Sequence, residues 1–132
     1  MPQPLARILY VEDEPDIRAV AQMALEAVGG FTVIACSSGS EALAAAPAAQ
    51  ADLLLLDVMM PGMDGPSTLK ALRAMPATAG TPVIFMTAKV QAAEVAQYRE
   101  LGAIDVIHKP FDPMELSAQI SRIWSQQGQQ GQ

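Results

Sequence analysis

Short apolar segments alternate with longer segments of helical spacing along the chain. The apolar segments cover residues 7–11, 31–35, 53–56, 83–86 and 106–108. Because they are apolar at consecutive positions, they are typical of strands buried on both faces in a parallel sheet covered by helices. The helical segments cover residues 16–28, 38–46, 66–75, 90–101 and 113–125. This alternation predicts an α/β fold of five strands and five helices with right-handed crossovers.

Residues that start or stop helices mark several boundaries. Gly29–Gly30 follow the first helical segment and Gly102 follows the fourth, which predicts that these helices end there. Ser38 and Glu41 have the spacing of a capping box, and Pro47 follows the same helical segment. We expect Pro47 to lie beyond the last turn of that helix.

Length and composition predict one globular domain. The chain has 132 residues, of which 51% are hydrophobic, enough for a single buried core. We expect this domain to span residues 1–125. The segment 126–132 reads QQGQQGQ, and we expect a disordered tail there because it has no apolar anchor.

Charge and cysteine content limit the classes of function. The net charge of −6 comes without a basic stripe, so we expect no direct nucleic-acid binding. Cys36 has no second cysteine to pair with and is expected to be a small buried hydrophobe. The N-terminal residues show no secretory pattern, and no apolar run is long enough to span a membrane. We expect a cytoplasmic protein.

Polar side chains follow the apolar segments at the point where each predicted strand ends. Glu12–Asp13 follow the first strand, Asp57 the third, Thr87 the fourth and Lys109 the fifth. In an open parallel sheet, ligands bind beyond these carboxyl ends, near the switch in strand order. If the first and third strands are neighbours, three carboxylates converge on one small site.

A divalent cation would relieve the repulsion between these carboxylates. Oxygen ligands without His or Cys favour Mg²⁺. Alternatively, Glu12–Asp13 belong to a solvated acidic loop, Lys109 is a structural counter-ion for Asp57, and Thr87 is an ordinary strand residue. A purely structural interpretation is less suited to Asp57, because it directly follows four leucines, where an unpaired carboxylate is costly.

Four motifs resemble the receiver domains of bacterial two-component response regulators, in particular single-domain regulators of the chemotaxis type. They are VEDEP at 11–15, LLLLDVMMPGMDG at 53–65, PVIFMTAK at 82–89 and GAIDVIHKPF at 102–111. Their order and spacing match the family over residues 7–124. The resemblance implies a flavodoxin-like, doubly wound, five-stranded parallel sheet in the order 2-1-3-4-5.

The resemblance also implies roles for the polar residues. Asp57 is expected to accept a phosphoryl group, with Lys109 and Thr87 holding phosphoryl oxygens. Mg²⁺ is expected to bind Asp13, Asp57 and the Met59 main-chain carbonyl directly, and Glu12 through water. The peptide bond before Pro110 is expected to be cis.

The family further implies the partners and limits of the function. A histidine kinase or phosphotransfer protein would donate the phosphoryl group, and a downstream protein would read the signal. No membrane contact is expected. The domain would catalyse only its own Mg²⁺-dependent phosphorylation and dephosphorylation.

One position departs from the family pattern. Three residues before the lysine, the family usually carries Tyr or Phe, but this chain carries Val106. We therefore expect the phosphorylation chemistry to survive and the aromatic coupling to the output face to change. His108, next to Lys109, is expected to be a packed or surface imidazole, because adjacent strand residues point to opposite faces.

Three other functions are weighed against this one. An aspartate-based phosphatase would need a second Asp at the position of Met59, and a flavodoxin-like electron carrier would need a phosphate-binding loop where Glu12–Asp13 stand. A receiver-like binding module that is never phosphorylated remains the main alternative. The presence of Asp57, Thr87 and Lys109 argues against it.

Overall fold

A five-stranded parallel sheet forms the centre of the molecule. The computed structural model describes residues 4–130, and the side chains of residues 4–127. The strands are β1 (Arg7–Val11), β2 (Thr32–Cys36), β3 (Leu53–Asp57), β4 (Val83–Thr87) and β5 (Ala103–His108). They lie in the order β2-β1-β3-β4-β5 and pair in parallel. The predicted α/β fold and strand order are confirmed.

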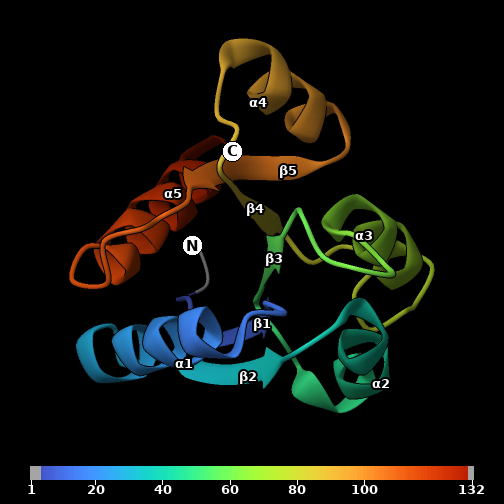
Figure 1. The fold of residues 1–132 in the computed structure, drawn as a ribbon, viewed down its shortest axis with the longest axis horizontal. Helices are drawn as coiled ribbons and strands as arrows, with labels where there is room; N and C mark the ends of the chain where they lie inside the picture. Colours follow the sequence, from blue (N-terminus) through green and yellow to red (C-terminus); the bar gives the residue numbers. More distant parts are fainter. Residues whose placement is uncertain (1–3, 131–132) are drawn as a thin grey trace.

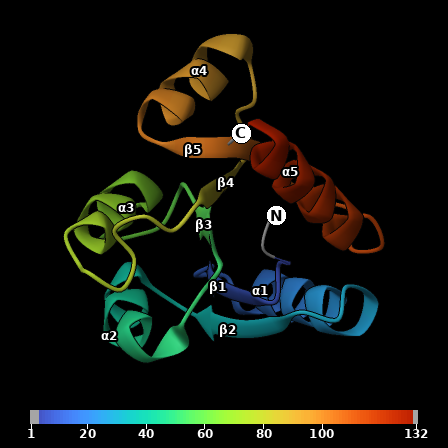
Figure 2. The ribbon, with the colours of Figure 1, turned by 180° about the vertical axis from the view of Figure 1, so that it is seen from behind.

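Helices cover both faces of this sheet. They are α1 (Pro15–Met23), which continues as the π-helical segment η1 (Ala24–Val28), α2 (Gly39–Ala49), α3 (Gly65–Arg73), α4 (Ala92–Glu100) and α5 (Leu116–Gln130). Figure 1 shows α1 and α5 on one side of the sheet, α2 and α3 on the other, and α4 beside β5. Figure 2 shows the same layers from behind. None of the helices in the described part of the chain is long and apolar enough to cross a membrane.

The core consists of two clusters, one on each side of the sheet. Leu54, Leu56 and Phe85 pack toward α2 and α3, whereas Tyr10, Leu55 and Met86 pack toward α1 and α5. The strands are buried on both faces, as their continuous apolar runs predict. Cys36 is 1% exposed and is a buried free thiol, as predicted.

Helix ends agree in part with the sequence prediction. The Ser38 side chain caps α2 by accepting a hydrogen bond from the Glu41 N–H at 3.1 Å. Gly30 and Gly102 follow η1 and α4 with φ of 72° and 112°, backbone that glycine adopts without penalty. The expectation for Pro47 was wrong, because Pro47 lies inside α2, which continues to Ala49.

The last helix begins later and ends later than expected. The sequence suggested residues 113–125, whereas α5 spans Leu116–Gln130. Residues 126–130, expected to be part of a disordered tail, therefore continue the helix, which agrees with the good helix propensity of glutamine. Residues 131 and 132 of the expected tail, and 1–3 of the expected domain, lie outside the described residues.

Candidate functional site

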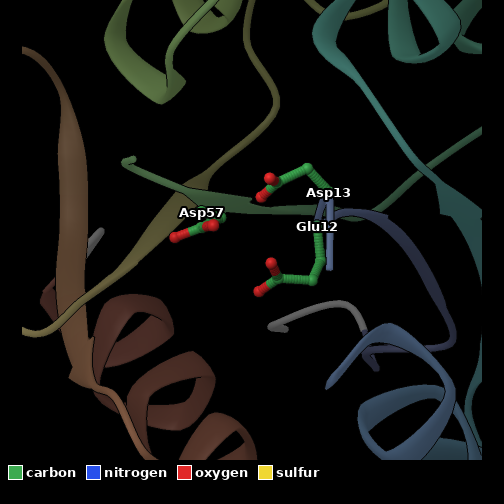
Figure 3. A group of neighbouring side chains, drawn as sticks. All are labelled: Glu12, Asp13 and Asp57. Carbon is green, nitrogen blue, oxygen red and sulfur yellow. The ribbon is translucent and has the colours of Figure 1, made fainter. Parts of the chain in front are cut away.

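Three carboxylates meet at the carboxyl ends of β1 and β3. Val11 pairs with Leu56 across these neighbouring strands, so Glu12 and Asp13 follow one strand where Asp57 ends the other. Ligand oxygens of Glu12, Asp13 and Asp57 all lie within 4.8 Å of one another. Figure 3 shows the three side chains converging, with Glu12 extending toward the side of the sheet that carries α1 and α5. Glu12 is 0% and Asp57 3% exposed, so this is not a solvated acidic loop.

Lys109 neutralises part of this charge. Its Nζ lies 2.7 Å from Oε1 of Glu12 and 3.2 Å from Oδ1 of Asp57. Lys109 follows β5, and its N–H donates to the Thr87 carbonyl at 2.9 Å, which fixes it beside the end of β4. The Lys109–Pro110 peptide bond is cis, as expected. The sequence suggested a pairing of Lys109 with Asp57, and the structure adds the shorter contact with Glu12.

Burial and charge shift the pKa values of these groups. Burial, followed by the charge of Glu12, raises the pKa of Asp57 to about 6, although Lys109 acts in the opposite direction. Burial alone would lower the pKa of Lys109, but the hydrogen bond to Glu12 and the charges of Asp57 and Glu12 outweigh it and raise that pKa. The site thus holds an ammonium that stays charged and a carboxylate that is ionised with difficulty.

The loop after β3 is held tightly at both ends. Val58 N–H donates to the Met86 carbonyl at 3.0 Å, and Gly65 N–H donates to the Val58 carbonyl at 2.9 Å. A Cβ atom at Gly65 would lie 2.5 Å from the Asp57 carbonyl oxygen, so only glycine permits this approach. Between these anchors, Met59 is 70% exposed. Its main-chain carbonyl stays a predicted metal ligand.

Thr87 ends β4 and is 2% exposed. Its hydroxyl oxygen accepts a hydrogen bond from the Lys89 N–H at 3.1 Å, which leaves the hydroxyl proton available to another acceptor. Lys89 itself is exposed. The predicted role of Thr87 therefore agrees with its hydrogen bonding, and stays a prediction.

Val106 stands where the family usually carries an aromatic residue, and α4 carries an aromatic residue, Tyr98, on the neighbouring element. Val106 pairs with Phe85 on the neighbouring strand and is half-buried. The ring of Phe85 instead meets Tyr98, with centroids 5.4 Å apart and planes tilted by 58°. His108 is exposed, as expected for a surface imidazole.

The donor set fits a hard divalent cation. Three carboxylates lie close together, and the one ammonium that contacts two of them balances only one negative charge. Within the described residues no His or Cys joins this group. All-oxygen donor sets of this kind suit Mg²⁺, which needs few protein ligands because it keeps several waters.

Comparison with known proteins identifies the family. A sequence profile described as the response regulator receiver domain matches residues 8–121 of this chain. The chain belongs to the response regulator receiver domain family. Receiver domains are signalling modules of two-component systems; they accept phosphate from histidine kinases and bind Mg²⁺ at an acidic pocket. The resemblance inferred from the four motifs is confirmed.

Individual relatives agree with this assignment. The DNA-binding response regulator MtrA of Mycolicibacterium smegmatis is 39% identical over 86% of this chain and 48% of its own length. The alkaline phosphatase synthesis transcriptional regulatory protein PhoP of Bacillus subtilis is also 39% identical, over 89% of this chain and 48% of its own. This receiver domain therefore spans about half the length of these curated relatives.

Solved structures cover the receiver domain more fully. The chemotaxis response regulator CheY4 of Vibrio cholerae has a TM-score of 0.82 at 31% identity, covering 91% of this chain and 99% of CheY4. A response regulator from Desulfuromonas acetoxidans has a TM-score of 0.79 at 33% identity, covering 92% and 98%. These neighbours support the flavodoxin-like fold inferred from the sequence.

Several groups at the site escaped sequence reasoning. Arg18 of α1 donates to the Glu12 carbonyl at 2.8 Å and so holds the loop that carries the acidic pair. The sequence marks Arg18 only as a helix residue, and no spacing rule singles it out. The sequence gives only weak indications for two others: Gly65 lies between Asp64 and Pro66, and Tyr10 places a hydroxyl in an otherwise apolar strand.

Proposed function

We propose that this receiver domain accepts a phosphoryl group on Asp57 from a histidine kinase or a phosphotransfer protein. One observation carries the proposal. A carboxylate 3% exposed at the end of β3 contacts the Lys109 ammonium at 3.2 Å and lies beside two further carboxylates. A structural counter-ion alone would not account for this cluster, because one ammonium balances only one of the three neighbouring carboxylates and the remaining charges repel one another.

The reaction is an exchange of bonds at phosphorus. A carboxylate oxygen of Asp57 forms a bond to phosphorus while the bond from phosphorus to the donor atom breaks. The donor atom, an imidazole nitrogen of phosphohistidine or the acetate oxygen of acetyl phosphate, leaves with the electron pair. The product is an acyl phosphate on Asp57.

Charge develops on the phosphoryl oxygens during this exchange, and two side chains are suited to stabilise it. Lys109 supplies an ammonium, and Thr87 supplies a hydroxyl proton while its oxygen keeps the hydrogen bond from Lys89 N–H. Thr87 ends β4 and Lys109 follows β5, so both backbones are already in place beside Asp57 when the phosphoryl group arrives.

Asp13, Asp57 and the Met59 carbonyl would hold Mg²⁺ directly, with Glu12 binding through water. Bound there, Mg²⁺ would neutralise negative charge on the carboxylates and on the phosphoryl oxygens. The convergent oxygens within 4.8 Å support this assignment.

The phosphorylated domain would act in the cytoplasm through contact with a downstream protein. The net charge of −6 makes this chain itself a poor partner for nucleic acid. The relatives whose names state DNA binding are about twice as long as the matched region. We therefore assign no nucleic-acid contact to the receiver domain.

Intact mass after incubation with acetyl phosphate and Mg²⁺ tests the proposal. We expect one added phosphoryl group on the wild type, none on Asp57→Asn, and normal labelling of Asp16→Asn, an exposed aspartate of α1. Labelling of Asp57→Asn would show that the acceptor lies elsewhere. An unlabelled wild type that still binds its partner would favour the receiver-like binding module.

A further inference from the structure

Tyr10 carries a buried polar atom with no visible purpose in the fold. Its side chain is 0% exposed, and among the described residues its hydroxyl has no hydrogen-bond partner. A buried hydroxyl without a partner costs free energy, whereas phenylalanine would fill nearly the same space without that cost. We therefore ask whether the hydroxyl gains a hydrogen-bond partner in another state of the molecule.

Tyr10 lies on the same side of the sheet as the Glu12 carboxylate. Tyr10 and Glu12 are two positions apart in an extended segment, so their side chains point to the same face of the sheet. Tyr10 belongs to the same core cluster as Leu25 of η1 and Leu116 of α5, and Figure 3 shows Glu12 extending toward the side of the sheet that carries these helices. Burial, then the charges of Glu12 and Asp57, raise the pKa of Tyr10, which agrees with a neutral phenol near both carboxylates.

Glu12 depends on Lys109 for its neutralisation. Its Oε1 accepts from Lys109 at 2.7 Å, and its Oε2 accepts from the Glu14 N–H at 3.1 Å. Under the proposed function, on which this inference rests, phosphorylation of Asp57 replaces the single carboxylate charge with a phosphoryl group of about −1.5 to −2 charges, whose oxygens attract the Lys109 ammonium. Glu12 would then lose its strongest donor while remaining buried, which is costly for a carboxylate.

We propose that the Tyr10 hydroxyl donates a hydrogen bond to the Glu12 carboxylate when Lys109 turns to the phosphoryl oxygens. Tyr10 is thus a positioning residue that keeps the acidic pair in place in the phosphorylated state. It is not needed before phosphorylation, because Lys109 then bonds Glu12, and this explains a donor that has no acceptor in the present structure.

The test compares two binding reactions in Tyr10→Phe, which removes only the hydroxyl. The first is Mg²⁺ binding without a phosphoryl mimic, and the second is beryllofluoride binding at saturating Mg²⁺, both by calorimetry. We expect beryllofluoride to bind about tenfold more weakly, the effect of one hydrogen bond to a charged group, with Mg²⁺ affinity changed by less than about twofold. Thr32→Val, which removes an exposed hydroxyl at the start of β2, far from the carboxyl ends of the strands, should alter neither.

A second measurement needs no substitution. In the wild type, the ¹³Cζ NMR signal of Tyr10 should move when beryllofluoride is added, because the hydroxyl gains an acceptor, and the Tyr10→Phe spectrum identifies this signal. An unmoved signal, an unchanged beryllofluoride affinity, or equal losses of both affinities would each overturn the inference. A wild type that neither acquires phosphate nor binds beryllofluoride would overturn the proposed function as well, so the two failures are distinguishable.

Discussion

Removing the charge of Asp57 should stabilise the fold. In the absence of Mg²⁺, Asp57 is 3% exposed, lies in a cluster with Glu12 and Asp13, and shares the single Lys109 ammonium with Glu12. Asp57→Asn keeps the shape of the side chain and removes one of these charges. Lys109 then retains its 2.7 Å contact with Glu12, so no buried charge is left unpaired.

The pKa shift sets the size and pH range of the effect. The pKa of Asp57 rises from 3.8 to about 6 on folding, so the folded state disfavours the ionised carboxylate. Well below pH 3.8 both states are protonated and the shift costs nothing, whereas well above pH 6 both are ionised and its full cost applies. Since one pKa unit is worth about 1.4 kcal/mol, Asp57→Asn should gain about 3 kcal/mol at pH 8 and only about 1 kcal/mol at pH 4.5.

Urea unfolding followed by circular dichroism at both pH values checks this expectation. Asp16→Asn, which removes an exposed charge, should give no comparable gain. Adding Mg²⁺ at pH 8 should stabilise the wild type more than Asp57→Asn and so reduce the difference. A variant less stable than the wild type at pH 8 would refute the reasoning, because the ion pair with Lys109 would then outweigh burial and repulsion.

Three further predictions concern the metal, the output face and the lifetime of the phosphoryl group. Asp13→Ala should weaken Mg²⁺ binding in calorimetry far more than Glu14→Ala, because the exposed Glu14 lies outside the carboxylate cluster; equal affinities would misplace the site. Beryllofluoride should change NMR shifts on α4 around Tyr98 more than around Val106, and Tyr98→Leu should reduce the α4 changes; large changes centred on Val106 would contradict this route. Met59 and Lys89 are exposed, and neither accepts a proton from water at neutral pH, so the phosphoryl group should last many minutes. It should decay about tenfold faster in the double variant Met59→Asn/Lys89→Glu. Loss of phosphate from the wild type within seconds would show that these two residues do not control its lifetime.

The strands and the gathering of the site residues were predictable because both follow from local patterns. Continuous apolar runs define buried parallel strands, and a parallel sheet brings its carboxyl ends to one edge. This is sufficient to bring Glu12, Asp13, Asp57 and Lys109 together. The strand order itself came from the family resemblance rather than from these patterns.

What the sequence did not reveal depends on tertiary packing. Pro47 was expected to lie beyond the last turn of α2, but the alanine-rich helix continues to Ala49, and Ala46 and Ala49 are buried against the sheet. The π-helical η1 has no sequence marker. Two further features depend on the positions of side-chain atoms in neighbouring strands: the contact of Lys109 with Glu12, and the Tyr10 hydroxyl without a partner. The pattern of apolar residues does not determine those positions.

The anchored loop after β3 has an evolutionary consequence. Gly65 lies close to the Asp57 carbonyl, and its N–H donates a hydrogen bond to the Val58 carbonyl, so the loop leaves the sheet and returns to it at the same place. The exposed Met59 lies on the part of the loop between these anchors. Under the proposed function, we expect mutations at such a position to alter how long the phosphoryl group persists without moving the residue proposed to receive it. Single substitutions could then adjust the duration of the signal during evolution while the phosphoacceptor and its chemistry stay unchanged.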